Sequence, residues 1–243
     1  MFKTIKNALK TPEVRKKLLY TLLLIVIFRL GCYITIPGVD SVTVSDQMKA
    51  ASNGVTGLID TISGGAFSRL SIFAMSITPY ITASIVIQLL GMVIPSLERL
   101  VKEGGEEGKT KVNKYTKILT VILALIEGLG VFFSYKSTGI FLDTGFLGGF
   151  LTVLSLMTGT ALLIWLGEQI TNKGIGNGIS MLIFVGIIAG LPKGITAVWK
   201  LIFVNGAFST VGLIKALAVV LGALVLVAGV IFVQLAERRI PVQ

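Results

Sequence analysis

Long apolar runs, separated by short charged stretches, dominate this chain. The hydrocarbon core of a bilayer is about 30 Å thick, so a helix needs about 20 mainly apolar residues to cross it. Six segments approach this length: Leu18–Ile36, Ile72–Val93, Ile118–Phe133, Phe146–Leu166, Ile175–Ile195 and Val211–Leu235. Only 14% of the residues are charged, against about 25% in a typical soluble domain. The sequence therefore predicts an all-α, polytopic transmembrane helix bundle.

The composition excludes several kinds of enzyme site. The chain contains no histidine and one cysteine, Cys32. Ser-His catalysis and haem ligation by histidine are therefore absent, and the usual zinc-hydrolase sites lose their main ligand. A single cysteine cannot form an internal disulfide. We expect no enzymatic activity, no metal and no cofactor. The first apolar segment also lacks a small-residue cleavage site, so we expect it to stay in the mature protein.

The distribution of Lys and Arg predicts the orientation, because short loops rich in these residues stay in the cytoplasm. With six spans, both termini lie on one side, which carries fifteen bases: Lys3, Lys6, Lys10, Arg15, Lys16, Lys17, Arg99, Lys102, Lys109, Lys111, Lys114, Lys117, Lys173, Arg238 and Arg239. The other side carries six: Lys49, Arg69, Lys136, Lys193, Lys200 and Lys215. We therefore place both ends of this chain in the cytosol.

The external connection between the first two spans contains a short amphipathic segment. Its apolar residues recur with helical spacing: Val55, Leu58, Ile59, Ile62 and Ala66. This spacing predicts one apolar face of a helix that is too short to cross a bilayer. Gly64 and Gly65 separate it from the next span and provide backbone freedom. A re-entrant half-helix fits, because irregular backbone at membrane depth occurs only inside protein or along a wet cavity.

The connection between the second and third spans, 96–117, has a different character. Residues 102–117 mix both signs of charge with three glycines. This composition favours a solvated cytosolic loop. A docking surface for a partner is the alternative, which charge alone cannot establish.

Four residues of the second span share one helix face: Ile77, Ile81, Ser84 and Gln88. Lipid does not favour polar side chains such as Ser84 and Gln88, so this face is expected to point into the protein or toward a passage through it. Ordinary packing between helices, with Gln88 as a polar contact, is the alternative.

Two stretches carry a resemblance to a known family. SIFAMSITPYITASIVIQLL (Ser71–Leu90) resembles the second-span segment of the SecY family of protein-conducting channels. WLGEQITNKGIGNGISMLIF (Trp165–Phe184) is similar to that family's segment joining the fourth and fifth spans. The lead-in ISGGAFSRL (Ile62–Leu70) adds to the resemblance, which extends over the whole chain.

The resemblance implies roles for particular residues. The family's pore constriction would fall on Ile77, Ile81 and Ile183, which are half of a ring. The plug would correspond to about 55–70, including Val55, Leu58, Ile59, Ile62, Gly64, Gly65, Ala66 and Phe67. The lateral gate of the second span would include Ser84 and Gln88. Docking of cytosolic partners would involve Lys109, Lys111, Lys114, Arg238 and Arg239.

The resemblance also implies a domain layout. Residues 1–17 would be a basic cytosolic N-terminus and 18–195 the five-span N-terminal half of the channel. An external hinge loop (196–210), a sixth span (211–235) and the start of a cytosolic loop (236–243) would follow. Family members have ten spans, so we expect this chain to be a SecY-like N-terminal half plus one span.

The glycine-rich stretch Gly174–Ser180 looks superficially like a phosphate-binding loop. Such a motif indicates nucleotide binding only between a strand and a helix, with a suitable lysine or acidic partner. That context is missing here. We expect a tight cytosolic turn in which Asn177 begins the fifth helix.

Arg29 and Glu127 are charged residues that lie within predicted spans, more than five residues from either end. Glu127 is expected to be protonated or paired, because an isolated carboxylate in apolar surroundings is costly. Arg29 offers an opposite charge, although the sequence does not show that the two meet. For Arg29 we favour snorkelling of the guanidinium toward the outer surface.

The function implied by the resemblance is conduction of unfolded polypeptides and lateral release of transmembrane segments into lipid. The implied partners are the membrane subunits SecE and SecG, the motor ATPase SecA, a translating ribosome with its RNA, and a secretory polypeptide with its signal sequence. The implied location is the bacterial plasma membrane. A secondary transporter of small solutes is the alternative, since its broken helices also give glycine-interrupted spans. An intramembrane protease is a weaker third possibility.

Overall fold

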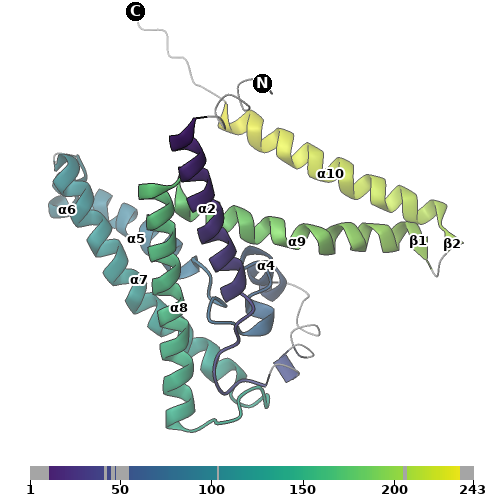
Figure 1. Ribbon diagram of the computed structural model, residues 1–243, viewed down its shortest axis with the longest axis horizontal. Helices are drawn as coiled ribbons and strands as arrows, with labels where there is room; N and C mark the ends of the chain where they lie inside the picture. Colours follow the sequence, from purple (N-terminus) through teal and green to yellow (C-terminus); the bar gives the residue numbers. More distant parts are fainter. Residues whose placement is uncertain are drawn as a thin grey trace, which may run out of the picture. The chain divides into compact units, whose positions relative to one another are not determined.

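The computed structural model describes residues 11–40, 43–44, 47, 55–102, 104–204 and 207–235 (Figure 1). Its elements are α2 (Pro12–Gly31), α4 (Val55–Ile62), η1 (Phe67–Arg69), α5 (Thr78–Val93), α6 (Pro95–Lys102), α7 (Gly105–Tyr135), α8 (Phe146–Lys173), α9 (Gly178–Ile202), β1 (Phe203–Val204), β2 (Ala207–Phe208) and α10 (Thr210–Gln234). The predicted all-α class is confirmed. The chain divides into two compact units, Met1–Gly190 and Leu191–Gln243.

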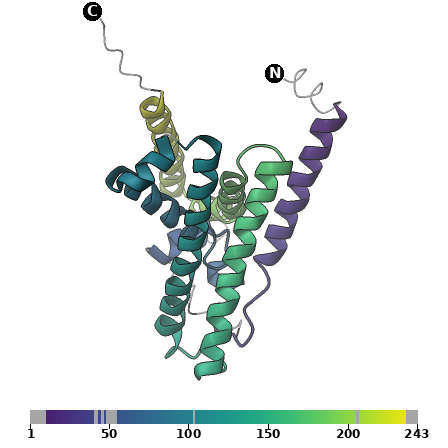
Figure 2. The same cartoon turned by 90° about the vertical axis from the view of Figure 1, so that its left-hand side faces the viewer.

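The first unit contains a row of neighbouring helices. α2 packs on α8, α8 on α7, and α7 on α5. Figure 2 shows α2, α8 and α7 side by side with their long axes roughly aligned. An ion pair between Lys117 and Glu168 joins α7 to α8. Glycine allows close approach at Gly159 of α8, where a Cβ would lie 1.7 Å from the carbonyl oxygen of Ile72. The row therefore positions the segment that leads into α5.

Four helices in the described part of the chain are long and apolar enough to cross a membrane: α7, α8, α9 and α10. α5 and α6 together would give a fifth, bent by 109°. The sequence predicted six segments. The remaining one is α2, whose apolar stretch is flanked by basic residues at Arg15–Lys17 and at Arg29.

The first predicted span, Leu18–Ile36, extends beyond the helix that the structure contains. α2 ends at Gly31, and Thr35 forms an isolated antiparallel bridge with Ser71. The amide of Ile36 donates to the carbonyl of Leu70 at 3.0 Å. Pro37 keeps Ile36 out of a helix, because the residue before a proline avoids helical conformations. The helix itself ends five residues earlier, at Gly31.

The second predicted span began too early. Helix α5 begins at Thr78, and the preceding residues 72–77 form turns, with Ser76 at a positive φ of 52°. Pro79 in the first turn fits this start, since the amide that proline lacks has no helical partner there. Pro95 then ends α5, because Ile94 before it is extended.

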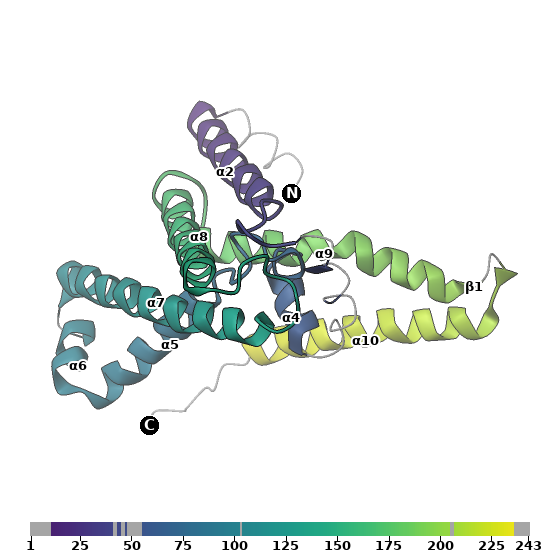
Figure 3. The same ribbon diagram turned by 90° about the horizontal axis from the view of Figure 1, so that it is seen from below.

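The expectation of a loop over 96–117 was wrong in its secondary structure. α6 and α7 occupy this stretch, and they pack together in Figure 3. Glu106 and Glu107 lie in the first turn of α7, where negative charge is favourable. A Cβ on Gly108 would lie 2.1 Å from the carbonyl oxygen of Leu100, so glycine permits the tight contact.

The external hinge loop predicted over 196–210 is largely replaced by regular structure. α9 continues through Pro192 to Ile202, and α10 begins at Thr210. Between them Phe203 pairs with Phe208 in a short antiparallel hairpin (Figure 3). Apolar residues such as Trp199, whose ring lies 4.8 Å from that of Phe203, extend the helix beyond the predicted end at Ile195.

The glycine-rich turn before α9 agrees with its prediction. The side-chain oxygen of Asn177 accepts hydrogen bonds from the amides of Ile179 (3.1 Å) and Ser180 (3.3 Å). This is an N-cap at the start of the fifth predicted span. The hydroxyl of Thr21 in α2 accepts from the amide of Ile175 at 3.1 Å and so fixes the turn to the first helix.

Candidate functional site

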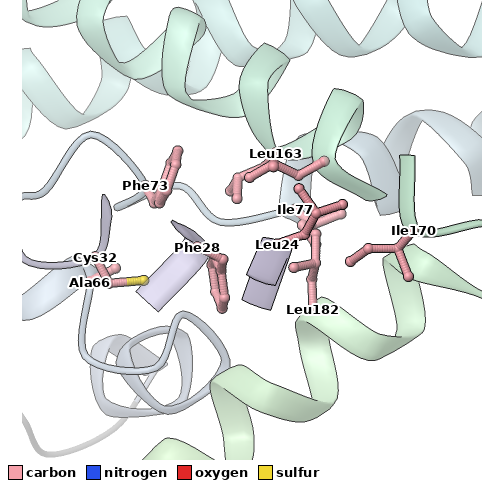
Figure 4. Packing of buried hydrophobic residues seen from close by; sticks show 10 residues of the cluster. Leu24, Phe28, Cys32, Ala66, Phe73, Ile77, Leu163, Ile170 and Leu182 are labelled. Carbon is pink, nitrogen blue, oxygen red and sulfur yellow. The ribbon is translucent and has the colours of Figure 1, made fainter. Parts of the chain in front are cut away.

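Three isoleucines lie in one apolar cluster of the first unit. Ile77 is 1% exposed and belongs to the buried part of the cluster, while Ile81 and Ile183 are half-buried and pack against it. Figure 4 shows Ile77 facing Leu182, Leu24 and Leu163. The buried members are Leu24, Phe28, Cys32, Ala66, Phe73, Ile77, Leu163, Leu166, Ile170 and Leu182. The structure therefore brings together, from α5 and α9, the residues that the resemblance assigned to a constriction.

Local backbone geometry sets the position of Ile77. It is the N-cap of α5, and its carbonyl accepts a hydrogen bond from the amide of Ile81 at 3.0 Å. The two side chains are therefore one helical turn apart on the same face. The positive φ of Ser76 and the proline at Pro79 fix where the helix begins.

The segment assigned to the plug consists of two short pieces rather than one half-helix. α4 ends at Ile62, and Gly64 and Gly65 follow with φ of 67° and 85°. L side chains rarely adopt this conformation, so both positions favour glycine. Ala66 lies beyond the helix end, so the predicted continuous face from Val55 to Ala66 was wrong in this detail.

Polar groups of the segment assigned to the plug satisfy one another at the turn. A carboxylate oxygen of Asp60 accepts from the amide of Ser68 at 2.7 Å, and its carbonyl accepts from the amide of Gly65 at 2.9 Å. The hydroxyl of Ser63 accepts from the amide of Phe67 at 3.1 Å. Phe67 and Ala66 are buried, whereas Ile62 is 40% exposed. Internal hydrogen bonds thus hold the turn in one conformation.

The plug segment also touches α9 directly. A Cβ on Gly64 would lie 3.0 Å from the Cα of Gly186, and a Cβ on Gly186 would lie 2.5 Å from the carbonyl oxygen of Ile62. Ala66 belongs to the same cluster as Ile77. Our sequence interpretation did not single out Gly186. The sequence shows that Gly186 lies one helical turn after Leu182. It does not show that Gly186 lies near the segment assigned to the plug.

The polar residues of α5 lie one turn apart. The amide nitrogen of Gln88 donates to the hydroxyl of Ser84 at 3.3 Å. Ser84 is half-buried and Gln88 is exposed. The pair gives one side of α5 a polar patch next to exposed aliphatic residues such as Ile85.

The basic residues assigned to docking are only partly within the described residues. Lys109, Lys111 and Lys114 are exposed on the first part of α7, and the amine of Lys109 lies 3.0 Å from Glu106. Arg238 and Arg239 lie outside the described residues.

Arg29 has a specific contact. Its Nη1 donates to the carbonyl oxygen of Gly64 at 3.0 Å, so the side chain reaches the plug segment. Glu127 is half-buried on α7. The guanidinium of Arg29 is thus held by backbone near the C-terminal end of α2.

Comparison with known proteins identifies the family. A SecY family model matches residues 71–243. The chain is 41% identical over 247 residues to the protein translocase subunit SecY of Staphylococcus carnosus, covering all of this chain and 57% of that protein. It is 39% identical to the SecY subunit of Aquifex aeolicus, with coverage of 100% and 57%. The chain belongs to the SecY family.

Solved structures agree on the fold of this SecY family member. A protein-conducting channel superposes with a TM-score of 0.64 at 22% identity, covering 96% of this chain and 50% of the other. Sec61 in a canine ribosome–channel complex gives 0.63 with the same identity and coverage. A SecY structure described as having a plug domain that stabilises the closed state and maintains a membrane seal gives 0.61 at 21% identity, covering 96% and 49%.

The extent of the match bears on function. This chain spans a little over half the length of the curated SecY relatives that it matches. The relatives are translocase channel subunits rather than members of a catalytic family.

Proposed function

We propose that this chain forms the N-terminal half, plus one span, of a membrane channel that conducts unfolded polypeptides and releases apolar segments sideways into lipid. The observation that carries the proposal is the single cluster containing Ile77, Ile81 and Ile183. A narrow level lined by large aliphatic side chains loses its water when empty and so blocks ions. The same flexible side chains can close around a passing chain.

The plug is the second element of the proposal. Val55–Leu70 caps the constriction at rest. This is supported by the packing of Ala66 in the apolar cluster that contains Ile77, and by the close approach of Gly64 to Gly186. The related SecY structure, whose plug stabilises the closed state, makes the same role reasonable here. Gly64 and Gly65 provide the hinge.

Opening follows a two-state scheme. An apolar signal segment enters beside Ser84 and Gln88, the hydrogen-bonded polar pair of α5. The segment favours the open state only by the difference between its affinities for the two states. Gating therefore requires contacts that form with the signal segment and exist only when the plug has moved.

The partners and the orientation belong to the same proposal. We assign SecE and SecG as membrane subunits, SecA or a translating ribosome as the source of driving force, and the bacterial plasma membrane as the location. Both ends of this chain lie in the cytosol. The exposed bases Lys109, Lys111 and Lys114 support this assignment, because they would give contacts with ribosomal RNA a salt-sensitive attraction.

A small-solute transporter is not favoured. Arg29 and Glu127 would be the candidate intramembrane charges of such a transporter. Arg29 instead donates to the backbone of Gly64, and the relatives are protein translocase subunits.

Photocrosslinking tests the proposal. A photoreactive residue replaces Ile81 or Ile183 in the complete gene product, and a secretory polypeptide is stalled during transport. We expect adducts with the polypeptide from both positions. The matched control is Ile122, which is 50% exposed on α7 and should give none. Absence of polypeptide adducts at Ile81 and Ile183, with transport otherwise normal, would contradict the proposal.

A further inference from the structure

Two arginines hold two consecutive carbonyl groups at the turn of the plug. Nη1 of Arg29 donates to the carbonyl oxygen of Gly64 at 3.0 Å, and Nη1 of Arg69 donates to that of Gly65 at 3.1 Å. Both glycines have positive φ. The arginines come from different places, because Arg29 belongs to α2 and Arg69 to η1.

The ring of Tyr33 lies near both guanidinium groups. The guanidinium carbon of Arg69 lies 4.4 Å from the ring centroid and that of Arg29 lies 5.7 Å from it. The negative face of an aromatic ring attracts cations at this range. Tyr33 therefore offsets the mutual repulsion of the two arginines and orients both side chains.

The contact with Arg29 joins the plug to the helices that surround it. A Cβ on Gly64 would lie 2.8 Å from Nη1 of Arg29 and 3.0 Å from the Cα of Gly186. The backbone at Gly64 is thus enclosed between an arginine of α2 and the backbone of α9. Moving the plug away requires breaking the hydrogen bond to Arg29 and this close packing together.

We propose that Arg29 and Arg69 are positioning residues that hold the plug in its resting place, with Tyr33 orienting them. The inference rests on the proposed function of Val55–Leu70 as a plug. Arg29 docks the plug on α2, since its bond links residues 35 positions apart. Arg69 shapes the turn, since its bond spans four residues. Loss of Arg29 therefore undocks the plug, whereas loss of Arg69 loosens its turn.

Cys32 provides a direct reporter of plug position. It is the only cysteine of the chain, it is buried, and it lies in the same cluster as Ala66 of the plug (Figure 4). A small thiol reagent reaches it only when the plug moves. Arg29 also lies beside this thiol, and its charge favours the reactive thiolate, so removing Arg29 lowers the intrinsic reactivity and a higher labelling rate in Arg29→Gln reports a larger undocked population. The hydrogen bond from the charged guanidinium stabilises the docked plug more than a neutral donor would. Arg29→Gln should therefore raise the labelling rate of Cys32 about tenfold.

The experiment uses the complete channel in membranes, with ion conductance measured alongside Cys32 labelling. We expect Arg29→Gln to raise both, and Arg29→Lys to restore most of the wild-type behaviour because it keeps a charged donor. Lys136→Gln is the matched control. It removes a cation whose recorded contact is with the ring of Phe132, at 5.9 Å, and with no residue of the plug, and it should change neither quantity.

A tether separates a specific role from general loss of structure. The Cγ2 of Thr61 lies 3.9 Å from the place of a Cβ on Gly190, so Thr61→Cys with Gly190→Cys places two thiols within reach of a disulfide. Forming this bond in Arg29→Gln should return labelling and conductance to wild-type values. A rise that persists after tethering would overturn the inference.

Glycine variants of Ile77, Ile81 and Ile183, measured in parallel, distinguish the two proposals. An unchanged labelling rate in Arg29→Gln overturns the role of the arginines, even if the glycine variants conduct ions. A second outcome is that Arg29→Gln raises Cys32 labelling while the glycine variants of the three isoleucines do not conduct ions. This outcome overturns the proposed function, and with it the gating role of the arginines.

Discussion

Gly186 of α9 lies so close to Ile62 at the end of α4 that a Cβ at position 186 would be 2.5 Å from the Ile62 carbonyl oxygen. The atom that would clash is backbone, so the plug itself must shift. We predict that Gly186→Ala weakens plug docking by about 1–3 kcal/mol, the usual cost of overpacking. Resting conductance of the complete channel should rise. Gly194→Ala on the same helix, where nothing lies within 4 Å, should leave conductance unchanged.

A second glycine should matter for folding rather than for gating. A Cβ on Gly159 would lie 1.7 Å from the carbonyl oxygen of Ile72. Gly159→Ala should therefore lower the unfolding free energy by about 1–3 kcal/mol or more, measured as the thermal midpoint in detergent. Gly130→Ala, in an open part of α7, should be neutral or slightly stabilising. Equal midpoints for the two variants would contradict the packing described here.

The N-cap of α9 makes a smaller contribution that can be measured locally. Asn177→Ala removes the acceptor for the amides of Ile179 and Ser180 and should cost about 1 kcal/mol. Hydrogen exchange of these two amides should accelerate, while Asn177→Asp, which keeps an acceptor, should stay close to wild type. Unchanged exchange in the alanine variant would show that another group caps the helix.

Orientation in the membrane can be tested with introduced thiols. Leu142 is 77% exposed between α7 and α8, and Lys109 is exposed near the start of α7. An impermeant thiol reagent added outside intact cells should label Leu142→Cys and not Lys109→Cys. Native Cys32 is buried and should give little background. The reverse pattern would invert the proposed topology.

Several features of the site follow from local sequence patterns. The spacing of Ile77 and Ile81 placed them on one helix face, and Asn177 identified the start of α9. Placing Ile183 beside Ile77 depended on resemblance to the SecY family, because local periodicity does not report which distant helices meet. The end of the first helix at Gly31 was missed because apolar residues continue to Ile36.

Close approaches between distant segments could not be read from the sequence. The contact of Gly186 with Ile62 and the donation from Arg29 to Gly64 depend on tertiary packing. Arg29 was expected to extend toward the outer surface, which does not predict a carbonyl partner. Similarly, the mixed charges of residues 102–117 suggested a loop, although acidic residues in the first turn and tight packing on α6 support a helix there.

The central claim is that Ile77, Ile81 and Ile183 form part of an apolar seal. The most direct measurement is ion conductance of the resting, complete channel in planar bilayers after all three are changed to glycine. Ile85→Gly with Ile188→Gly is the matched control, since these residues are 51% and 42% exposed on the same two helices. We predict a clear rise in resting conductance for the triple variant and none for the control. A triple variant that is folded, inserted and still impermeable to ions would contradict the account.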